Sequence, residues 1–134
     1  MGIKVLVTGG RDYTDQKHVW GVLKELADTV GIDTLIHGDC PTGADHLADQ
    51  WAIKRIIPVI RCPADWDTYG KSAGPRRNQL MVELKPDLII SFPGNRGTTD
   101  CVSRARAHGI KLVDLRDGSS LIELSSPPTV PTAK

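Results

Sequence analysis

The sequence predicts a Rossmann-like α/β fold: a three-layer α/β/α sandwich around a parallel sheet of about five strands, in the order 3-2-1-4-5. Short apolar runs alternate with longer stretches of helical periodicity, and few polar residues interrupt the apolar runs. That pattern is typical of a parallel sheet with helices on both faces, joined by right-handed crossovers. Pro58 lies in the third apolar run and has no N–H to donate, which favours an edge position for that strand.

The first half of the chain contains three predicted strands and two predicted helices. Residues 3–8 form an apolar run that ends at two glycines, and Asp15 can cap a helix that extends to about residue 30. The apolar stripe of that helix consists of Val19, Val22, Leu23, Leu26 and Val30. The next elements are a strand at 33–37, a helix at 43–55 and a strand at 56–61.

The second half continues the alternation after an unusually long connection from Cys62 to Ala73. Pro75 suits the first turn of a helix, so a third helix is predicted at about 75–85. The remaining elements are a strand at 87–92, a helix at 98–108 and a strand at 110–115. We expect one domain over residues 1–118 and a C-terminal extension at 119–134, whose segment 125–134 is rich in Pro, Ser and Thr and predicted to be disordered.

The composition is close to electrically neutral, with 17 Lys and Arg against 16 Asp and Glu in 134 residues. A broad basic surface is therefore not expected, which argues against a protein that coats nucleic acid. Three cysteines without a CxxC pair favour the reducing cytoplasm over a disulfide framework. No apolar run is long enough to span a membrane, and the N-terminus lacks the features of a signal peptide. The histidines show no metal-ligand spacing with the cysteines, so we expect neither a metal nor another cofactor.

A ligand site is expected where the strand order reverses, between the first and fourth strands. Three glycine-bearing loops should meet at that edge of the sheet: residues 8–12, 37–45 and 93–98. Glycine lets backbone N–H groups approach an anion closely, and helix N-termini add unsatisfied donors. The sequence therefore predicts a phosphate-bearing ligand.

Four arginines fall near the same edge. Arg76 and Arg77 follow a Gly-Pro pair in the predicted first turn of the third helix, where a cation opposes the helix dipole. Either they are solvated or paired with a carboxylate such as Glu83 or Asp67, or they meet an anion that offsets the repulsion. Arg11 and Arg96 lie on the same predicted rim, so overall neutrality is compatible with a local arginine cluster.

Acidic and aromatic side chains admit two interpretations each. Thr42 and Asp45 have the spacing of a helix capping box, so Asp45 is either a capping residue or a catalytic acid. Asp12, Asp39 and Asp100 are expected on the rim, where they could bind ribose hydroxyls or act as general acids or bases. Trp66 and Tyr69 could form a lid that stacks on a base, or Trp66 could anchor its loop to the core. Cys101, at the start of the fourth predicted helix, is either a thiol with a lowered pKa or a packing residue.

Four sequence blocks carry a resemblance to a known family: VTGGRDYTD (7–15), HGDCPTGADHLADQWA (37–52), CPADWDTYGKSAGPRRNQLM (62–81) and SFPGNRGTTDCVSRA (91–105). Over about residues 3–116 the chain resembles the YpsA-related group of the SLOG superfamily, Rossmann-like proteins that include the LOG phosphoribohydrolases and the DprA DNA-processing proteins. The resemblance implies that a small nucleotide-derived ligand is bound. With the neighbouring rim residues included, the candidate ligand-binding set is Gly9, Gly10, Arg11, Asp12, Gly38, Gly43, Ala44, Asp45, Arg76, Arg77, Asn78, Gly94, Asn95, Arg96, Gly97 and Thr98.

The resemblance leaves the activity open. LOG enzymes carry the pattern PGGxGTxxE, and on residues 93–101 this places Asn95 at the second glycine and Cys101 at the catalytic glutamate. Asp100 is one position early, a rotation of roughly 100° on a helix. Hydrolysis of an N-glycosidic bond would therefore need Asp39, Asp45 or Asp100 as the catalytic acid.

Three functions follow as hypotheses. The first is a nucleotide-binding sensor or sequestering domain, in a phage or anti-phage context that the superfamily suggests, and the alternative is a LOG-like nucleotide hydrolase. DprA-like binding of single-stranded DNA is disfavoured because the charge is balanced and no basic groove with aromatic residues is evident. The relatives often assemble, so a homodimer or higher homo-oligomer is also expected.

Overall fold

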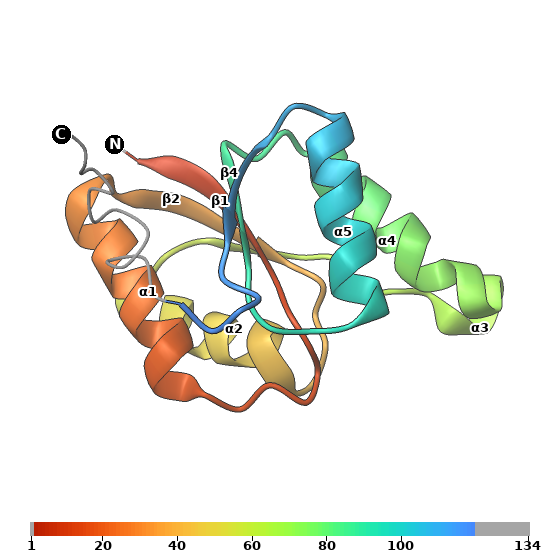
Figure 1. The fold of residues 1–134 in the computed structure, drawn as a ribbon, viewed down its shortest axis with the longest axis horizontal. Coiled ribbons are helices and arrows are strands. Elements are labelled where there is room, and N and C mark those ends of the chain that lie inside the picture. The colour runs from red at the N-terminus through yellow and green to blue at the C-terminus, as the bar shows by residue number, and fades with distance from the viewer. Residues whose placement is uncertain (1, 120–134) are drawn as a thin grey trace, which may run out of the picture.

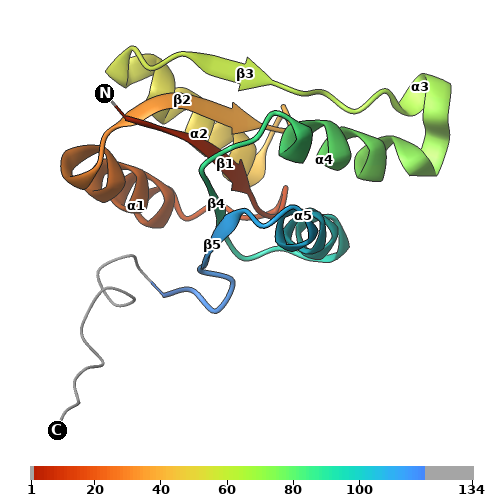
Figure 2. The same ribbon diagram turned by 90° about the horizontal axis from the view of Figure 1, so that it is seen from above.

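A computed structural model describes residues 2–119 of the chain (Figures 1 and 2). Its five parallel strands lie in the order β3-β2-β1-β4-β5, which confirms the predicted fold class and strand order. The strands are β1 (Ile3–Thr8), β2 (Ile32–His37), β3 (Val59–Arg61), β4 (Leu88–Ser91) and β5 (Lys111–Asp114). The disorder predicted at 125–134 lies outside the described residues.

Each face of the sheet is covered by a pair of helices (Figure 2). On one face lie α1 (Gln16–Thr29) and α2 (Gly43–Arg55), and on the other α4 (Ala73–Glu83) and α5 (Arg96–Ala107). Alternate residues of β1 serve the two faces: Val5 and Val7 pack with α1 and α2, whereas Leu6 packs with α4 and α5. The central strands are buried on both sides, which explains their continuous apolar sequence.

Helix α1 follows its predicted pattern closely. The side chain of Asp15 accepts a hydrogen bond from the N–H of His18 at 3.1 Å, as expected of an N-cap. All but one of the predicted stripe residues are buried, and the exception is Val30, which is 53% exposed. Val30 lies beyond the last helical residue, at the C-cap, so its side chain does not continue the buried stripe.

The third strand is shorter than the predicted 56–61. Ile56 adopts a left-handed conformation (φ 57°) that ends α2, and its side chain is 90% exposed. Pro58 has no N–H for the ladder, but its carbonyl oxygen accepts from the N–H of Leu35 at 2.9 Å. Regular pairing therefore begins at Val59, on the edge strand that Pro58 predicted.

The long connection after β3 is helical rather than a bare loop. It contains the short helix α3 (Trp66–Tyr69) and the 3₁₀ helix η1 (Gly70–Ser72), which leads directly into α4. Pro75 is consequently the third residue of α4, still within the first turn, where its missing N–H costs no helical hydrogen bond. Helix α5 begins at Arg96, two residues earlier than predicted. Figures 1 and 2 show α3 at the outer end of α4, away from the sheet.

Candidate functional site

Backbone hydrogen bonds join the three glycine-bearing loops at the carboxyl edge of the sheet, as the sequence predicted. The N–H of Gly10 donates to the carbonyl oxygen of Pro93 at 2.8 Å, which links the loops after β1 and β4. The carbonyl oxygen of Gly10 accepts from the N–H of Ala44 at 3.2 Å, and the hydroxyl of Thr42 donates to the carbonyl oxygen of Arg11 at 2.8 Å. Gly10 is therefore the residue at which the three loops meet.

Two glycines permit this close approach. Gly43 has a positive φ of 78°, and a side chain there would overlap the backbone of Gly10 and Arg11. A Cβ atom on Gly94 would lie 2.7 Å from the nitrogen of Gly10 and would also overlap the side chain of Thr98. Both positions therefore require the absence of a side chain.

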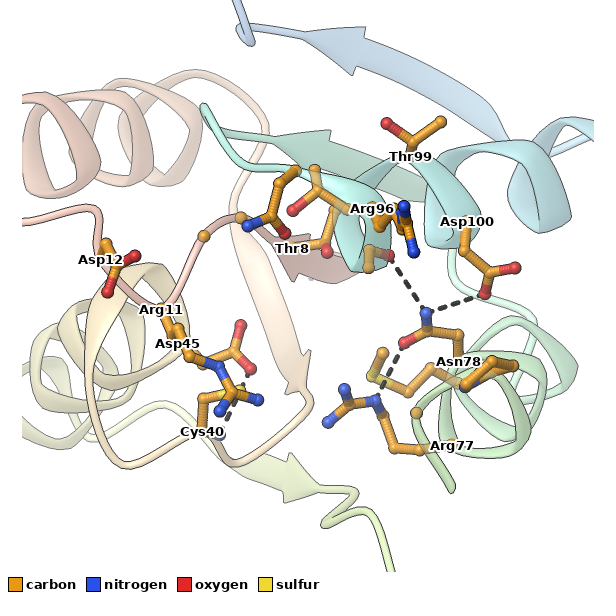
Figure 3. A pocket seen from close by; sticks show the side chains of 18 of the residues that line it. Thr8, Arg11, Asp12, Cys40, Asp45, Arg77, Asn78, Arg96, Thr99 and Asp100 are labelled. Carbon is orange, nitrogen blue, oxygen red and sulfur yellow. Dashed lines mark hydrogen bonds between the residues drawn. The ribbon is translucent and has the colours of Figure 1, made fainter. Parts of the chain in front are cut away.

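The joined loops form one wall of a cavity of about 840 Å³, within the range of small-molecule sites (Figure 3). Eleven residues of the candidate binding set line it: Gly9, Gly10, Arg11, Asp12, Asp45, Arg77, Asn78, Asn95, Arg96, Gly97 and Thr98. Trp66 and Asp100 line it as well. Seven residues outside the candidate set complete the lining: Thr8, Cys40, Lys71, Gly74, Pro75, Met81 and Thr99.

The other candidates lie outside this lining. Gly38, Gly43, Ala44 and Gly94 belong to the loops behind the cavity wall. The side chain of Asp39 is exposed outside the cavity. Arg76 and Tyr69 face away from it together, with the guanidinium 4.3 Å from the centre of the ring.

The lining of the cavity includes groups suited to an anion. Asn95 is the N-cap of α5 but makes no side-chain capping hydrogen bond, so it leaves the N–H groups of the first turn without a side-chain acceptor. The side chains of Arg11 and Arg96 are exposed and line the same cavity. Backbone donors and the positive end of the helix dipole thus face the same cavity as two guanidinium groups, of which Arg96 lies at the start of α5 and Arg11 lies beside Cys40 and Asp45 (Figure 3).

Across the cavity, Arg77 and Asn78 tie α4 to two of the loops, and Figure 3 shows the hydrogen bonds of Asn78. A guanidinium nitrogen (Nη1) of Arg77 donates to the carbonyl oxygen of Gly38 at 2.6 Å, and its Nε donates to Oδ1 of Asn78 at 2.9 Å. The amide nitrogen of Asn78 donates to the carbonyl oxygen of Gly97 at 3.2 Å and to Asp100 at 3.0 Å. The buried amide of Asn78 is therefore fully engaged between α4 and the start of α5.

Arg76 and Arg77 do not pair with Glu83 or Asp67, the carboxylates considered as their partners from the sequence. Within residues 2–119, Arg76 and Arg77 form no ion pair, and Glu83 accepts instead from Gln79 at 2.9 Å. Arg77 lines the cavity and has no carboxylate of the described residues within 4 Å, whereas Arg76 stacks on Tyr69.

Asp45 is the acid most deeply placed in the cavity. Asp45 is only 6% exposed, and its Oδ2 accepts hydrogen bonds from the N–H groups of Gly38 at 3.1 Å and Cys40 at 3.4 Å. Burial raises the pKa of Asp45, although the charge of Arg77 and the Cys40 N–H act in the opposite direction. The predicted capping box is wrong, because Asp45 turns toward the loop after β2 and the Thr42 hydroxyl bonds to Arg11.

The pKa of Asp100 is shifted in the opposite direction to that of Asp45. Partial burial acts to raise its pKa, but hydrogen bonds from Arg104 at 2.8 Å and Asn78 at 3.0 Å outweigh it and hold the pKa below the ordinary value. Cys101 is fully buried, and burial raises the pKa of its thiol to about 12. Cys101 is therefore a packing residue rather than an activated thiol.

The sequence did not reveal a polar network that is centred on the buried His37. His37 is 1% exposed, and its Nδ1 accepts from the N–H of Asp39 at 2.9 Å while its Nε2 lies 2.7 Å from Asp49. Nε of Arg61 donates to the same oxygen of Asp49 at 2.8 Å. The network supports the segment 38–40 that encloses the Asp45 carboxylate. No local spacing could reveal it, because its members come from β2, α2 and β3.

Residues 2–119 contain neither a metal-binding cluster nor a membrane-spanning helix. No cluster of three or more His, Cys, Asp or Glu side chains is arranged to hold a metal ion. None of the helices in this part of the chain combines the length and the apolar character needed to cross a membrane.

Two solved structures share the fold. The molybdenum cofactor binding protein from the phototrophic bacterium Rippkaea orientalis superposes with a TM-score of 0.68 at 22% identity, over 85% of this chain and 76% of that chain. The X-ray structure of TM1055 superposes with a TM-score of 0.70 at 19% identity, over 94% of this chain and 81% of that chain. At these identities the likeness concerns the fold alone.

Sequence comparison gives the family. The Gene 61 protein of Mycobacterium phage D29 is 35% identical over 123 residues, in a match that covers 85% of this chain and 97% of that relative. The sequence model of the YspA, cpYpsA-related SLOG family matches residues 3–69, which include the first two resemblance blocks. The chain belongs to the YspA, cpYpsA-related SLOG family.

Proposed function

We propose that the chain binds a nucleotide or nucleotide-derived ligand in the 840 Å³ cavity and acts as a sensor or sequestering protein. One observation carries the proposal. The cavity is lined by the N-terminus of α5, where the N-cap side chain makes no capping hydrogen bond, and by the guanidinium groups of Arg11 and Arg96. The half-exposed ring of Trp66 lines the same cavity. An anion-binding end and an aromatic surface in one cavity match the two chemically distinct ends of a nucleotide.

The phosphate would lie against the first turn of α5. There it can accept from backbone N–H groups and from Arg11 and Arg96, in hydrogen bonds that a negative charge strengthens. These two side chains reach the cavity from different loops, and both are exposed, so binding of one phosphate by both requires the Arg11 side chain to turn toward the start of α5.

The base would stack on Trp66. The indole is 50% exposed and belongs to neither apolar core cluster, so it does not anchor its segment to the core. Its ring edge instead lies over Gly74, where an added Cβ atom would come within 3.2 Å of the ring. The ring is thus positioned by α4 while an open face remains for a planar ligand.

Hydrolysis of the N-glycosidic bond remains the second candidate because of Asp45. A buried carboxyl group with a raised pKa in a ligand cavity can stay protonated at a higher pH than an ordinary aspartate, as a general acid requires. Against this, the position that aligns with the LOG glutamate is Cys101, which is fully buried in the α4–α5 core.

The two candidates are separated by titrating AMP, GMP, CMP and UMP into the purified protein and chromatographing the mixtures. Tight binding without release of free base supports the sensor, and release of base supports the hydrolase. The double variant Arg11→Ala/Arg96→Ala should weaken binding by about tenfold or more, since each lost charge-assisted hydrogen bond contributes about 1.5–3 kcal/mol. Arg106→Ala, an exposed arginine near the far end of α5, is the matched control. If the protein binds none of these four nucleotides and no dinucleotide built from them, the proposal is wrong.

A further inference from the structure

A second groove adjoins the main cavity. It has a volume of about 540 Å³ and is lined by Tyr69, Ser72, Pro75, Arg76, Leu80 and Arg104 among others. Pro75 lines both spaces. Asp100 lines the main cavity and Arg104 lines the groove, and their side chains form an ion pair at 2.8 Å. The two spaces are therefore neighbours, with Pro75 and this ion pair between them.

Helix α3 presents one aromatic ring to each space. Trp66 lines the main cavity, and Tyr69, three residues later, lines the groove. The two residues are 50% and 46% exposed, although both rings would be more stable in apolar contact. Leu80, also in the groove, is 59% exposed. The groove therefore offers an unfilled apolar surface beside the site at which we place the first base.

The charge in the groove favours an anionic ligand. Its lining contains Arg76 and Arg104 and no carboxylate. Arg104 is already neutralised by Asp100. Arg76 forms no ion pair within the described part of the chain; its Nε donates only to the neutral hydroxyl of Ser72 at 3.1 Å, and its guanidinium is held 4.3 Å from the Tyr69 ring. The stacked guanidinium is thus oriented and retains an unpaired positive charge.

We propose that this groove is a subsite for a second nucleoside, so that the ligand of the protein is a dinucleotide whose first nucleotide occupies the main cavity. The linking phosphate would cross Pro75 and meet Arg76, and the second base would stack on the Tyr69–Arg76 pair. Aromatic rings with an adjacent arginine bind successive bases in this way, without requiring a particular base. This inference depends on the proposed nucleotide-binding function and narrows its ligand class.

Isothermal titration tests the inference with three probes. The first is the mononucleotide that binds most tightly among AMP, GMP, CMP and UMP. The second and third contain the same nucleoside twice: the 5′-phosphorylated dinucleotide with a 3′–5′ linkage, and the dinucleotide with a 5′–5′ diphosphate linkage. At least one dinucleotide should bind about 5- to 150-fold more tightly than the mononucleotide, the gain that stacking of one additional base provides.

Variants of the groove residues then test whether the higher affinity for the dinucleotide comes from the groove. Tyr69→Ala should reduce dinucleotide affinity to within about twofold of that of the mononucleotide. Tyr69→Phe should keep the higher dinucleotide affinity because it keeps the aromatic ring. Arg76→Ala should reduce the dinucleotide affinity and make that affinity less dependent on salt concentration. The same variants should leave the affinity for the mononucleotide unchanged. Ile53→Ala, a 57% exposed residue of α2 outside both spaces, is the control.

The outcomes separate the two proposals. If the mononucleotide binds and neither dinucleotide binds more tightly, or if Tyr69→Ala weakens all three probes equally, the second subsite does not exist but the nucleotide site stands. If neither a mononucleotide nor a dinucleotide binds, the proposed function fails and this inference fails with it.

Discussion

Arg77 donates from Nη1 to the carbonyl oxygen of Gly38 at 2.6 Å, and this single hydrogen bond joins α4 to the loop after β2 across the candidate site. A Cβ atom on Gly38 would lie 2.8 Å from the guanidinium carbon of Arg77 and 3.0 Å from the Asp45 carboxylate. The cation, the carbonyl and the buried acid are therefore packed around one glycine. The relationship connects the position of Arg77 to the loop that encloses Asp45.

Arg77→Ala should therefore lower stability and ligand affinity together. Loss of the charge-assisted hydrogen bond should reduce the free energy of unfolding by about 1.5–3 kcal/mol. Arg77→Lys keeps the charge but loses the planar donor geometry, so it should retain only part of both properties. Urea denaturation and nucleotide titration measure the two effects. Arg76→Ala, which removes a side chain outside the cavity, should leave mononucleotide affinity unchanged.

Gly94→Ala should disrupt the junction of the loops. The added methyl group would overlap Thr98 and lie 2.7 Å from the nitrogen of Gly10, and overpacking of this kind costs about 1–3 kcal/mol. Gly21→Ala is the control, because a Cβ atom there meets nothing within 4 Å and alanine favours the helix interior. Thermal unfolding should show a lower melting temperature for the first variant and an equal or higher one for the second. Equal melting temperatures for Gly94→Ala and the wild type would refute the proposed crowding.

Asp45 should make stability decrease as pH rises. Because burial raises its folded-state pKa above the ordinary value of 3.8, its contribution to stability is complete below that value and is lost as pH rises through the raised pKa. Asp45→Asn keeps an oxygen for the N–H groups of Gly38 and Cys40 and cannot ionise, so it should be more stable than the wild type at neutral pH. The difference should shrink toward pH 4 in urea titrations. A constant difference across this range would contradict the raised pKa.

Asp49 should show the opposite pH dependence. Burial acts to raise its pKa, but hydrogen bonds from Arg61 and His37 outweigh it, and the folded-state pKa lies below 3.8. Its contribution is therefore present above pH 3.8 and is lost as pH falls through the lowered pKa. Asp49→Asn should cost about 1–3 kcal/mol near neutral pH, and the cost should decrease in acid. Opposite pH trends for the Asp45 and Asp49 variants provide an internal comparison within one helix.

The sequence was sufficient to predict the sheet and its ligand edge, because both depend on patterns that are local in the chain. The apolar run at 3–8 and the edge position of Pro58 led to the observed strand order. Gly43 and Gly94 occupy positions where three loops make contact, and glycine-bearing turns are visible without a structure. These features required no knowledge of side-chain direction.

Side-chain direction is what the sequence could not supply. Arg76 and Arg77 are adjacent, so on a helix they point roughly 100° apart, and only one of them can line the cavity. Which one does so depends on where α4 begins and on the packing of α3 against it, and neither is encoded in a short motif. The burial of Asp45 and the contact of His37 with Asp49 likewise depend on how α2 crosses behind the sheet.

The central claim, that the cavity binds the phosphate of a nucleotide at the start of α5, is tested most directly by amide chemical-shift mapping. The protein labelled with nitrogen-15 is titrated with the tightest-binding mononucleotide and, separately, with the corresponding nucleoside, which lacks the phosphate. The nucleotide should shift the amides of Gly10, Arg96 and Gly97 most strongly, and the nucleoside should shift these three far less. Equal shifts with both ligands, or shifts concentrated away from the cavity, would contradict phosphate binding at the start of α5.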